Sequence, residues 1–231
     1  MNAIFLDSLL RDENELKRHI RSVLAGRTRR IIPKENLRES AVLIPICFNE
    51  DGSSIVVTKR SMNVEHHKGE ISFPGGGAET EDDSLVATAL REAYEEIGLL
   101  PADVDVLGLL DDHISIMGFH ITPVVGAIPC PYDFTINSES ETLLHVPLRH
   151  ALTDTAWMAE KSTFMGKDFN IYFLEIEGGV VWGATARMLK HFIDLIAGRT
   201  VAFSKVSAYA RSWVEDVISR QSEYQVNNIE E

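Results

Sequence analysis

The sequence has few cysteines and lacks the segments that exported and membrane proteins need. Its two cysteines, Cys47 and Cys130, are too few for the disulfide framework of a small secreted domain. The first seven residues have no basic flank and no sustained apolar core, so they do not resemble a signal peptide. The longest apolar runs, such as residues 41–47, are far shorter than the ~20 residues that span a bilayer. We therefore expect a protein of the reducing cytoplasm with no membrane partner.

Basic residues are also scarce: 22 Lys and Arg face 35 Asp and Glu, for a net charge of −13. Such a charge argues against nucleic acid as a partner, because neutralising phosphates needs a basic surface. The imbalance is concentrated in residues 69–160, which hold 17 acidic residues and only two basic ones, Arg91 and Arg149. Charge alone leaves two interpretations open, a solvated acidic face or a site for a hard divalent cation.

The pattern of apolar residues predicts a mixed α/β protein. We expect strands at 41–48, 55–59, 71–73, 104–110, 121–128 and 169–176, and helices at 1–26, 83–97, 184–197 and 204–220. This pattern divides the chain into an N-terminal helix with a basic connector (1–38), a main domain (39–200) and a C-terminal helix with a polar tail (201–231). The connector owes its charge to Arg27, Arg29 and Arg30.

The helix expected at 83–97 carries an unusual group of acids. Its predicted cap is Asp82 or Asp83, and Gly98 is expected to end it. Glu92, Glu95 and Glu96 are related as i, i+3 and i+4, so they project from one face. Negative charge in the last turn costs ~0.3–1 kcal/mol per residue, and one cation, Arg91, does not balance three anions. A divalent cation beside the adjacent glycine turn would remove this conflict.

The glycine turn and the acidic helix together resemble the signature of the Nudix hydrolases. That signature reads Gly-x5-Glu-x7-Arg-Glu-U-x-Glu-Glu-x-Gly-U, where U is a bulky aliphatic residue, and it falls on residues 77–99. The chain matches it at Gly77, Arg91, Glu92, Glu95, Glu96, Gly98 and Leu99. Asp83 replaces the first Glu and Ala93 replaces the first U. Because Asp is shorter than Glu, Asp82 is an alternative for the role of that first Glu.

A second pattern, upstream, resembles the coenzyme A pyrophosphatase branch of the same family. The branch signature reads Leu-Leu-Thr-x-Arg-(Ser/Ala)-x3-Arg-x3-Gly-x3-Phe-Pro-Gly-Gly. The chain matches it at Thr58, Arg60, Ser61, Gly69, Phe73, Pro74, Gly75 and Gly76. Glu65 replaces the second Arg, which reverses the local Coulomb interaction with a phosphate. The resemblance therefore defines the reaction better than the substrate.

The resemblance implies a fold and a reaction. The fold is an α/β/α sandwich with a mixed central sheet and added N- and C-terminal helices. Because Nudix enzymes often dimerise, a homodimer is also expected. The reaction is hydrolysis of a diphosphate linkage by a water that Mg²⁺ or Mn²⁺ activates. The expected substrate is coenzyme A or acyl-coenzyme A, which yields 3′,5′-ADP and (acyl-)4′-phosphopantetheine. Two alternatives stay open: another small diphosphate substrate, such as NADH, ADP-ribose or a nucleotide sugar, and a non-catalytic ligand sensor.

The resemblance also implies roles for individual residues. The metal ligands are Glu92, Glu95 and Glu96, which Arg91 orients through salt bridges. The general base is one of three acids, Glu95, Glu96 or the loop residue Glu139. Substrate contacts are expected from Arg60, His67, Gly75 and Gly76. Asp82 and Asp83 are further acids that could assist the metal site.

Overall fold

The computed structural model describes residues 8–33, 37–49, 52–62, 68–115, 118–164, 167–212, 214 and 216. Glu65, at the departing position of the branch signature, and His67, one of the expected substrate residues, lie outside the described residues.

The centre of the molecule is an eight-stranded mixed sheet. Its longest strands, β1 (Arg38–Asn49) and β7 (Phe119–Ile128), run parallel over ten paired positions, from Arg38 opposite Phe119 to Cys47 opposite Ile128. The remaining pairs are antiparallel, which makes the sheet mixed. The other strands are β2 (Gly52–Arg60), β3 (Ile71–Ser72), β4 (Gly75–Gly77), β5 (Asp105–Leu109), β6 (His113–Ile114) and β8 (Ser140–Pro147).

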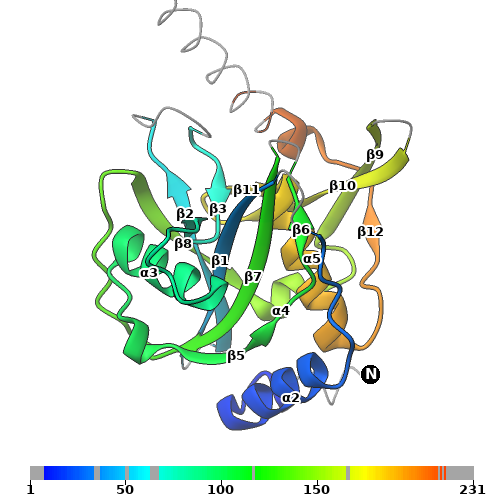
Figure 1. Ribbon diagram of the computed structural model, residues 1–231. Helices are drawn as coiled ribbons and strands as arrows, with labels where there is room; N and C mark the ends of the chain where they lie inside the picture. Colours follow the sequence, from blue (N-terminus) through cyan, green and yellow to red (C-terminus); the bar gives the residue numbers. More distant parts are fainter. Residues whose placement is uncertain are drawn as a thin grey trace, which may run out of the picture.

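Helices cover both faces of this sheet. Along β1, Leu43 and Cys47 pack toward α3 (Leu85–Ile97), whereas Ile44 and Ile46 belong to the core on the side of α5 (Gly183–Ala197). This alternation is the period of two of a strand that is buried on both faces. Figure 1 shows α3 and α5 on opposite sides of β1 and β7. The predicted α/β sandwich is therefore confirmed.

Further helical elements complete these layers. The N-terminal helix α2 (Glu13–Ala25) packs against α5 and β5. The sidechain of Asp12 caps it, since its carboxylate accepts a hydrogen bond from the backbone N–H of Glu15. Two short elements connect strands, the 3-10 helix η1 (Pro101–Asp103) and α4 (Leu148–Ala151).

A second sheet lies beside the first, and of its strands the sequence pattern predicts only the one at 169–176, which is confirmed as β10. The sheet contains β11 (Gly179–Trp182), β10 (Lys167–Ile176), β9 (Trp157–Phe164) and β12 (Phe203–Ser204), in that order. Residues 203–204 pair with β9, so the helix expected from residue 204 begins later, at residue 208. The prediction fails there because strand pairing with a distant segment is not visible in local periodicity.

The two cysteines are paired in the structure. Cys47 on β1 and Cys130, just beyond β7, form a disulfide with their Cα atoms 5.5 Å apart. One disulfide is not the framework of a small secreted domain, but it removes the support that the cysteines lent to a reducing compartment.

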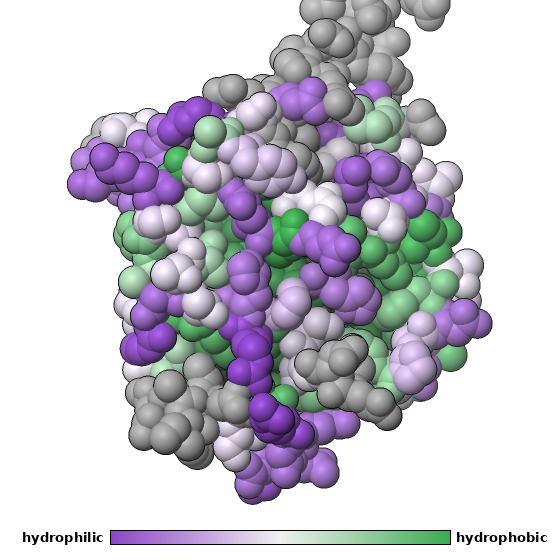
Figure 2. Space-filling view, turned by 180° about the vertical axis from the view of Figure 1, so that it is seen from behind, coloured by the Kyte–Doolittle hydropathy of each residue, from purple (hydrophilic) through white to green (hydrophobic). Residues whose placement is uncertain are grey.

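Hydrophilic side chains form a band down the face of the molecule opposite the view of Figure 1 (Figure 2). Within the described part of the chain, no helix is long and apolar enough to cross a membrane. Large apolar side chains that are exposed are Ile31, Tyr94, Leu100, Ile114, Ile136, Phe203 and Tyr209.

Candidate active site

The acidic helix α3 is capped at both ends by local interactions. The hydroxyl of Ser84 accepts a hydrogen bond from the backbone N–H of Ala87 at 3.2 Å, so Ser84, and not Asp82 or Asp83, is the N-cap. Because the hydroxyl of Ser84 caps the helix, the carboxylate of Asp82 can bind another group. Gly98 ends the helix in the left-handed conformation at φ 69°, as the sequence predicts.

The glycine turn runs directly beside this helix because it has no side chains. Gly75 and Gly76 pair with Val42 and Ala41 of β1. A Cβ on Gly75 would lie 2.4 Å from the carbonyl oxygen of Ala41, and one on Gly76 would lie 2.5 Å from the carboxylate of Glu92. The missing side chains thus let the backbone approach both the sheet and the acidic helix.

Arg91 connects the acids around the turn. Its Nε and Nη2 atoms donate to the two carboxylate oxygens of Asp82, each at 3.0 Å. Nη2 also donates to the carbonyl of Gly77 at 2.8 Å, while Nη1 donates to Glu92 at 3.0 Å and to Glu95 at 3.2 Å. The expected Arg91–Glu95 pair is therefore present, and Arg91 holds the glycine turn and two of the helix acids in one arrangement.

Asp82 is a structural partner of Arg91. Its carboxylate also accepts hydrogen bonds from the backbone N–H of Glu79 and the hydroxyl of Thr88. The pKa of Asp82 is well below its usual range, chiefly because Arg91 donates to it. Asp83, by contrast, is exposed.

The three helix acids differ in burial. The side chains of Glu92 and Glu96 are 16% and 8% exposed, whereas that of Glu95 is 50% exposed. Burial raises the pKa of Glu92, against the opposing effect of Arg91. Burial also raises the pKa of Glu96 to about 7, and although Arg60 opposes this shift, the carboxylates of Glu92 and Glu139 add to it. Two of the acids are thus held where their negative charge is unfavourable.

Arg60 joins the helix to a loop that the sequence places far away. Its guanidinium lies 3.2 Å from Glu139 and 3.8 Å from Glu96. The loop is fixed to the end of α3, because the N–H of Asn137 donates to the carbonyl of Glu96 at 3.0 Å and that of Thr135 to the carbonyl of Ile97 at 3.1 Å. These contacts satisfy carbonyls that the helix leaves free, and they bring Glu139 to the site.

Thr135 and Asn137 are positioning residues that sequence reasoning missed. The side chain of Asn137 also accepts a hydrogen bond from the N–H of Glu139 at 2.9 Å. The only local signal is an Asn two residues before an acid, which is typical of a turn in which the side chain binds the backbone. Of the expected substrate residues, Arg60, Gly75 and Gly76 lie at the site, and His67 is outside the described residues.

The donor set fits a hard divalent cation. Glu92 and Glu96 supply carboxylate oxygens, the ligands that Mg²⁺ and Mn²⁺ prefer, and a cation would relieve their mutual repulsion. Within the described residues, no three His, Cys, Asp or Glu side chains are already grouped around one point. Glu92 and Glu95 instead form salt bridges with Arg91. The described side chains therefore provide candidate metal ligands, but these ligands are not gathered around a single metal position.

Comparisons with known sequences identify similar proteins. Residues 37–167 match the sequence model of the NUDIX domain. Over 161 residues the chain is 35% identical to a protein of Yersinia pestis (strain Pestoides F) named "Uncharacterized Nudix hydrolase NudL", with 69% of this chain and 80% of the relative covered. A protein of Yersinia pseudotuberculosis serotype O:1b (strain IP 31758) with the same name matches equally.

Solved structures similar to this one carry related names. A MutT/nudix family protein from Enterococcus faecalis aligns with a TM-score of 0.45 at 11% identity, over 80% of this chain and 73% of that one. A Nudix hydrolase from M. smegmatis aligns with a TM-score of 0.42 at 22% identity, over 49% of this chain and 72% of that one.

Proposed function

Because this chain belongs to the Nudix family of hydrolases, we propose that it hydrolyses the diphosphate linkage of coenzyme A or acyl-coenzyme A. The products would be 3′,5′-ADP and (acyl-)4′-phosphopantetheine. The observation that carries the reaction is the placement of the buried acids Glu92 and Glu96 against a glycine turn, with Arg60 and Glu139 beside them. The substrate class rests on the pattern from Thr58 to Gly76 that resembles the coenzyme A pyrophosphatase branch.

Glu92, Glu95 and Glu96 are the proposed ligands of Mg²⁺ or Mn²⁺. When bound, the metal supplies positive charge to the phosphate oxygens and lowers the pKa of the attacking water. Arg91 orients Glu92 and Glu95 through hydrogen bonds of 3.0 and 3.2 Å. Asp82 keeps Arg91 in place from the other side. The glycine turn also holds one of these acids, because the backbone of Gly75 donates a hydrogen bond to Glu96.

Of the three candidate bases, Glu139 is the one we propose. Glu95 and Glu96 are both assigned to the metal, and Glu96 is in addition buried. The carboxylate of Glu139 is 53% exposed, so water reaches it, while Arg60 holds it 3.2 Å away. Glu139 would accept the proton of the attacking water at a carboxylate oxygen. Arg60 would then be freed to pair with a phosphate of the substrate.

The proposal is tested with the intact chain and a panel of substrates. Protein stripped with EDTA is incubated with coenzyme A, acetyl-coenzyme A, NADH, ADP-ribose or a nucleotide sugar, with and without Mg²⁺ or Mn²⁺, and products are identified by mass. We expect 3′,5′-ADP from the coenzyme A substrates only when metal is added. Preferential cleavage of another diphosphate would overturn the substrate class but not the reaction. If no member of the panel is cleaved while the protein binds one of them, the sensor alternative is favoured.

A further inference from the structure

A cavity lies on the opposite side of the central sheet from α3. Its volume is about 440 Å³, within the range of small-molecule sites. Its walls come from the connector after α2, the β5–β6 segment, β7, β10 and α5. Pro123 of β7 lines it, and Pro123 has the strand parity of Ile121 and Val125, which pack on the α5 side. The active-site acids lie on the other face, so this cavity is separate from them.

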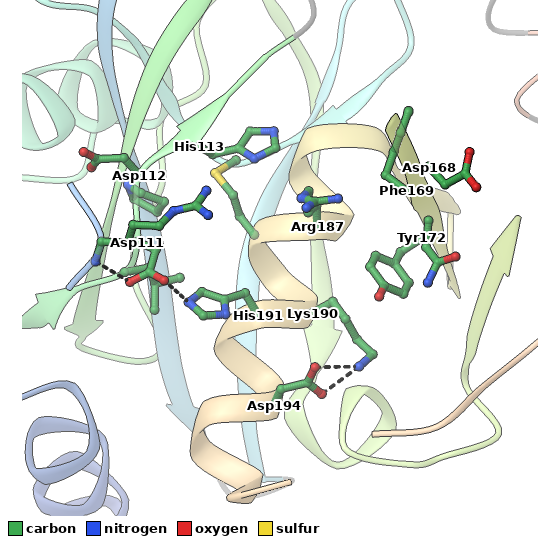
Figure 3. A pocket seen from close by; sticks show the side chains of 15 residues that line it. Asp111, Asp112, His113, Asp168, Phe169, Tyr172, Arg187, Lys190, His191 and Asp194 are labelled. Carbon is green, nitrogen blue, oxygen red and sulfur yellow. Dashed lines mark hydrogen bonds and ion pairs between the residues drawn. The ribbon is translucent and has the colours of Figure 1, made fainter. Parts of the chain in front are cut away.

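Basic side chains enter the cavity from three segments far apart in the sequence. Arg30 comes from the connector, His113 from β6 and Arg187 from α5. Figure 3 shows His113 and Arg187 pointing into the space between β6 and α5. Within the described residues, neither Arg30 nor Arg187 has a side-chain hydrogen bond or an ion pair. By comparison, Arg27 and Arg29 of the same connector bind Asp111 and Asp112 respectively.

The acids that line the cavity do not neutralise these cations. Asp111 pairs with Arg27 and lies 3.5 Å from His191, and Asp194 binds Lys190. Asp112 accepts hydrogen bonds from Arg29, His120 and Thr122 and points away from the cavity, as Figure 3 shows.

Asp168, the remaining acid, also points away (Figure 3) and accepts a hydrogen bond from Thr163. In a chain with a net charge of −13, this cavity therefore retains positive charge.

The pKa of His113 reflects the positive charge of the cavity. Burial, together with the charges of Arg187 and Arg30, lowers its pKa to about 4. The ring is thus neutral at pH 7, and the two guanidinium groups contribute to keeping it so. An anion placed between them would reverse that effect and favour the protonated ring.

We propose that this cavity binds a small organic phosphate. The phosphate would lie between Arg30 and Arg187, because guanidinium groups bind phosphate oxygens in pairs of hydrogen bonds. The ring or apolar part of the ligand would lie against Phe169 and Tyr172, which line the β10 wall. The site is independent of the reaction proposed above, since it uses none of the same residues.

Binding is measured by nuclear magnetic resonance of the ¹⁵N-labelled histidine rings, in EDTA so that metal-dependent binding elsewhere is suppressed. AMP, inorganic phosphate and adenosine are the probes, and His113→Gln assigns the His113 signal. We expect AMP to shift the His113 signal and to raise the pKa of His113. We expect inorganic phosphate to do so at about tenfold higher concentration, and adenosine not to do so.

Arg187→Gln should weaken AMP binding about tenfold or more, because it removes a charged hydrogen-bond donor. Arg18→Gln is the matched control, since Arg18 is 74% exposed on α2, and it should bind AMP as the unmodified chain does. Turnover of the diphosphate substrate should be unchanged in both variants. A His113 signal that does not respond to AMP, equal affinity for AMP and inorganic phosphate, or undiminished binding in Arg187→Gln would each overturn the proposal.

Discussion

Arg91 donates hydrogen bonds to both carboxylate oxygens of Asp82, from Nε to one and from Nη2 to the other, each at 3.0 Å. This pair ties the segment before α3 to the helix face that carries Glu92 and Glu95. Asp82 therefore supports the site by holding Arg91. Asp83, which stands at the signature position of the first Glu, is exposed.

The Asp82–Arg91 pair should make stability depend on pH. The pKa of Asp82 is lowered in the folded protein, so its contribution is present above its ordinary value of 3.8 and is lost as the pH falls toward the folded value. Asp82→Asn should lower the free energy of unfolding by about 1–3 kcal/mol at pH 7 and by less at pH 2.5, in urea titrations. Asp83→Asn, at an exposed position, should change it by no more than about 0.5 kcal/mol. An equal loss from Asp82→Asn at both pH values would contradict the pairing.

Glu96→Gln should separate activity from stability. The substitution keeps the shape of the side chain but removes a buried charge that repels Glu92 and Glu139. We expect metal-dependent turnover to be nearly abolished while the melting temperature does not fall. Glu81→Gln, a change at an exposed acid near the glycine turn, should leave both unchanged. A Glu96→Gln enzyme with normal turnover would refute the metal role.

The glycine turn offers a matched pair of substitutions. A Cβ at position 76 would lie 2.5 Å from the Glu92 carboxylate, whereas one at position 77 would meet nothing within 4 Å. Gly76→Ala should displace Glu92, lower kcat/KM by about tenfold or more and weaken the apparent affinity for Mn²⁺. Gly77→Ala should behave almost like the unmodified enzyme. Metal titrations of both variants measure the difference, and equal effects would show that the distance to Glu92 is unimportant.

The base assignment is tested on two acids of the same strand region. Glu139 and Glu141 each lie 3.2 Å from a basic side chain of β2, Arg60 and Lys59 respectively. Glu139→Gln should reduce kcat by about 10²–10⁴ and change KM little, because general-base catalysis acts on the chemical step. Glu141→Gln should retain activity. Steady-state kinetics decide, and a large loss only in Glu141→Gln would reverse the assignment.

Position 65 tests the substrate class. Glu65 stands where the coenzyme A pyrophosphatase signature has Arg, so Glu65→Arg should raise kcat/KM for coenzyme A by restoring a favourable Coulomb interaction with phosphate. Kinetics with coenzyme A and ADP-ribose measure whether the gain is selective. No change with either substrate would show that this position does not contact phosphate.

Local pattern was sufficient for the acidic helix. The spacing predicts a helix at 83–97, and α3 begins only two residues later because Ser84 takes the cap. The Arg91–Glu95 pair and the end at Gly98 follow from the same spacing, since they depend on neighbours within one or two turns. Of the second sheet, the pattern predicts the strand at 169–176, which is β10, whereas β12 was missed because its two residues pair with β9, far earlier in the chain.

The sequence by itself determined the order of the glycine turn, the arginine and the three glutamates, because helix periodicity places residues i, i+3 and i+4 without reference to the rest of the chain. Only the tertiary structure decided that Glu92 and Glu96 are buried while Glu95 is exposed, and that Arg60 meets Glu139 across 79 positions. It also decided that Arg30 and Arg187 share a cavity. These relationships depend on which strands pair and which face of a helix meets the sheet, and that choice is made by packing over the whole chain.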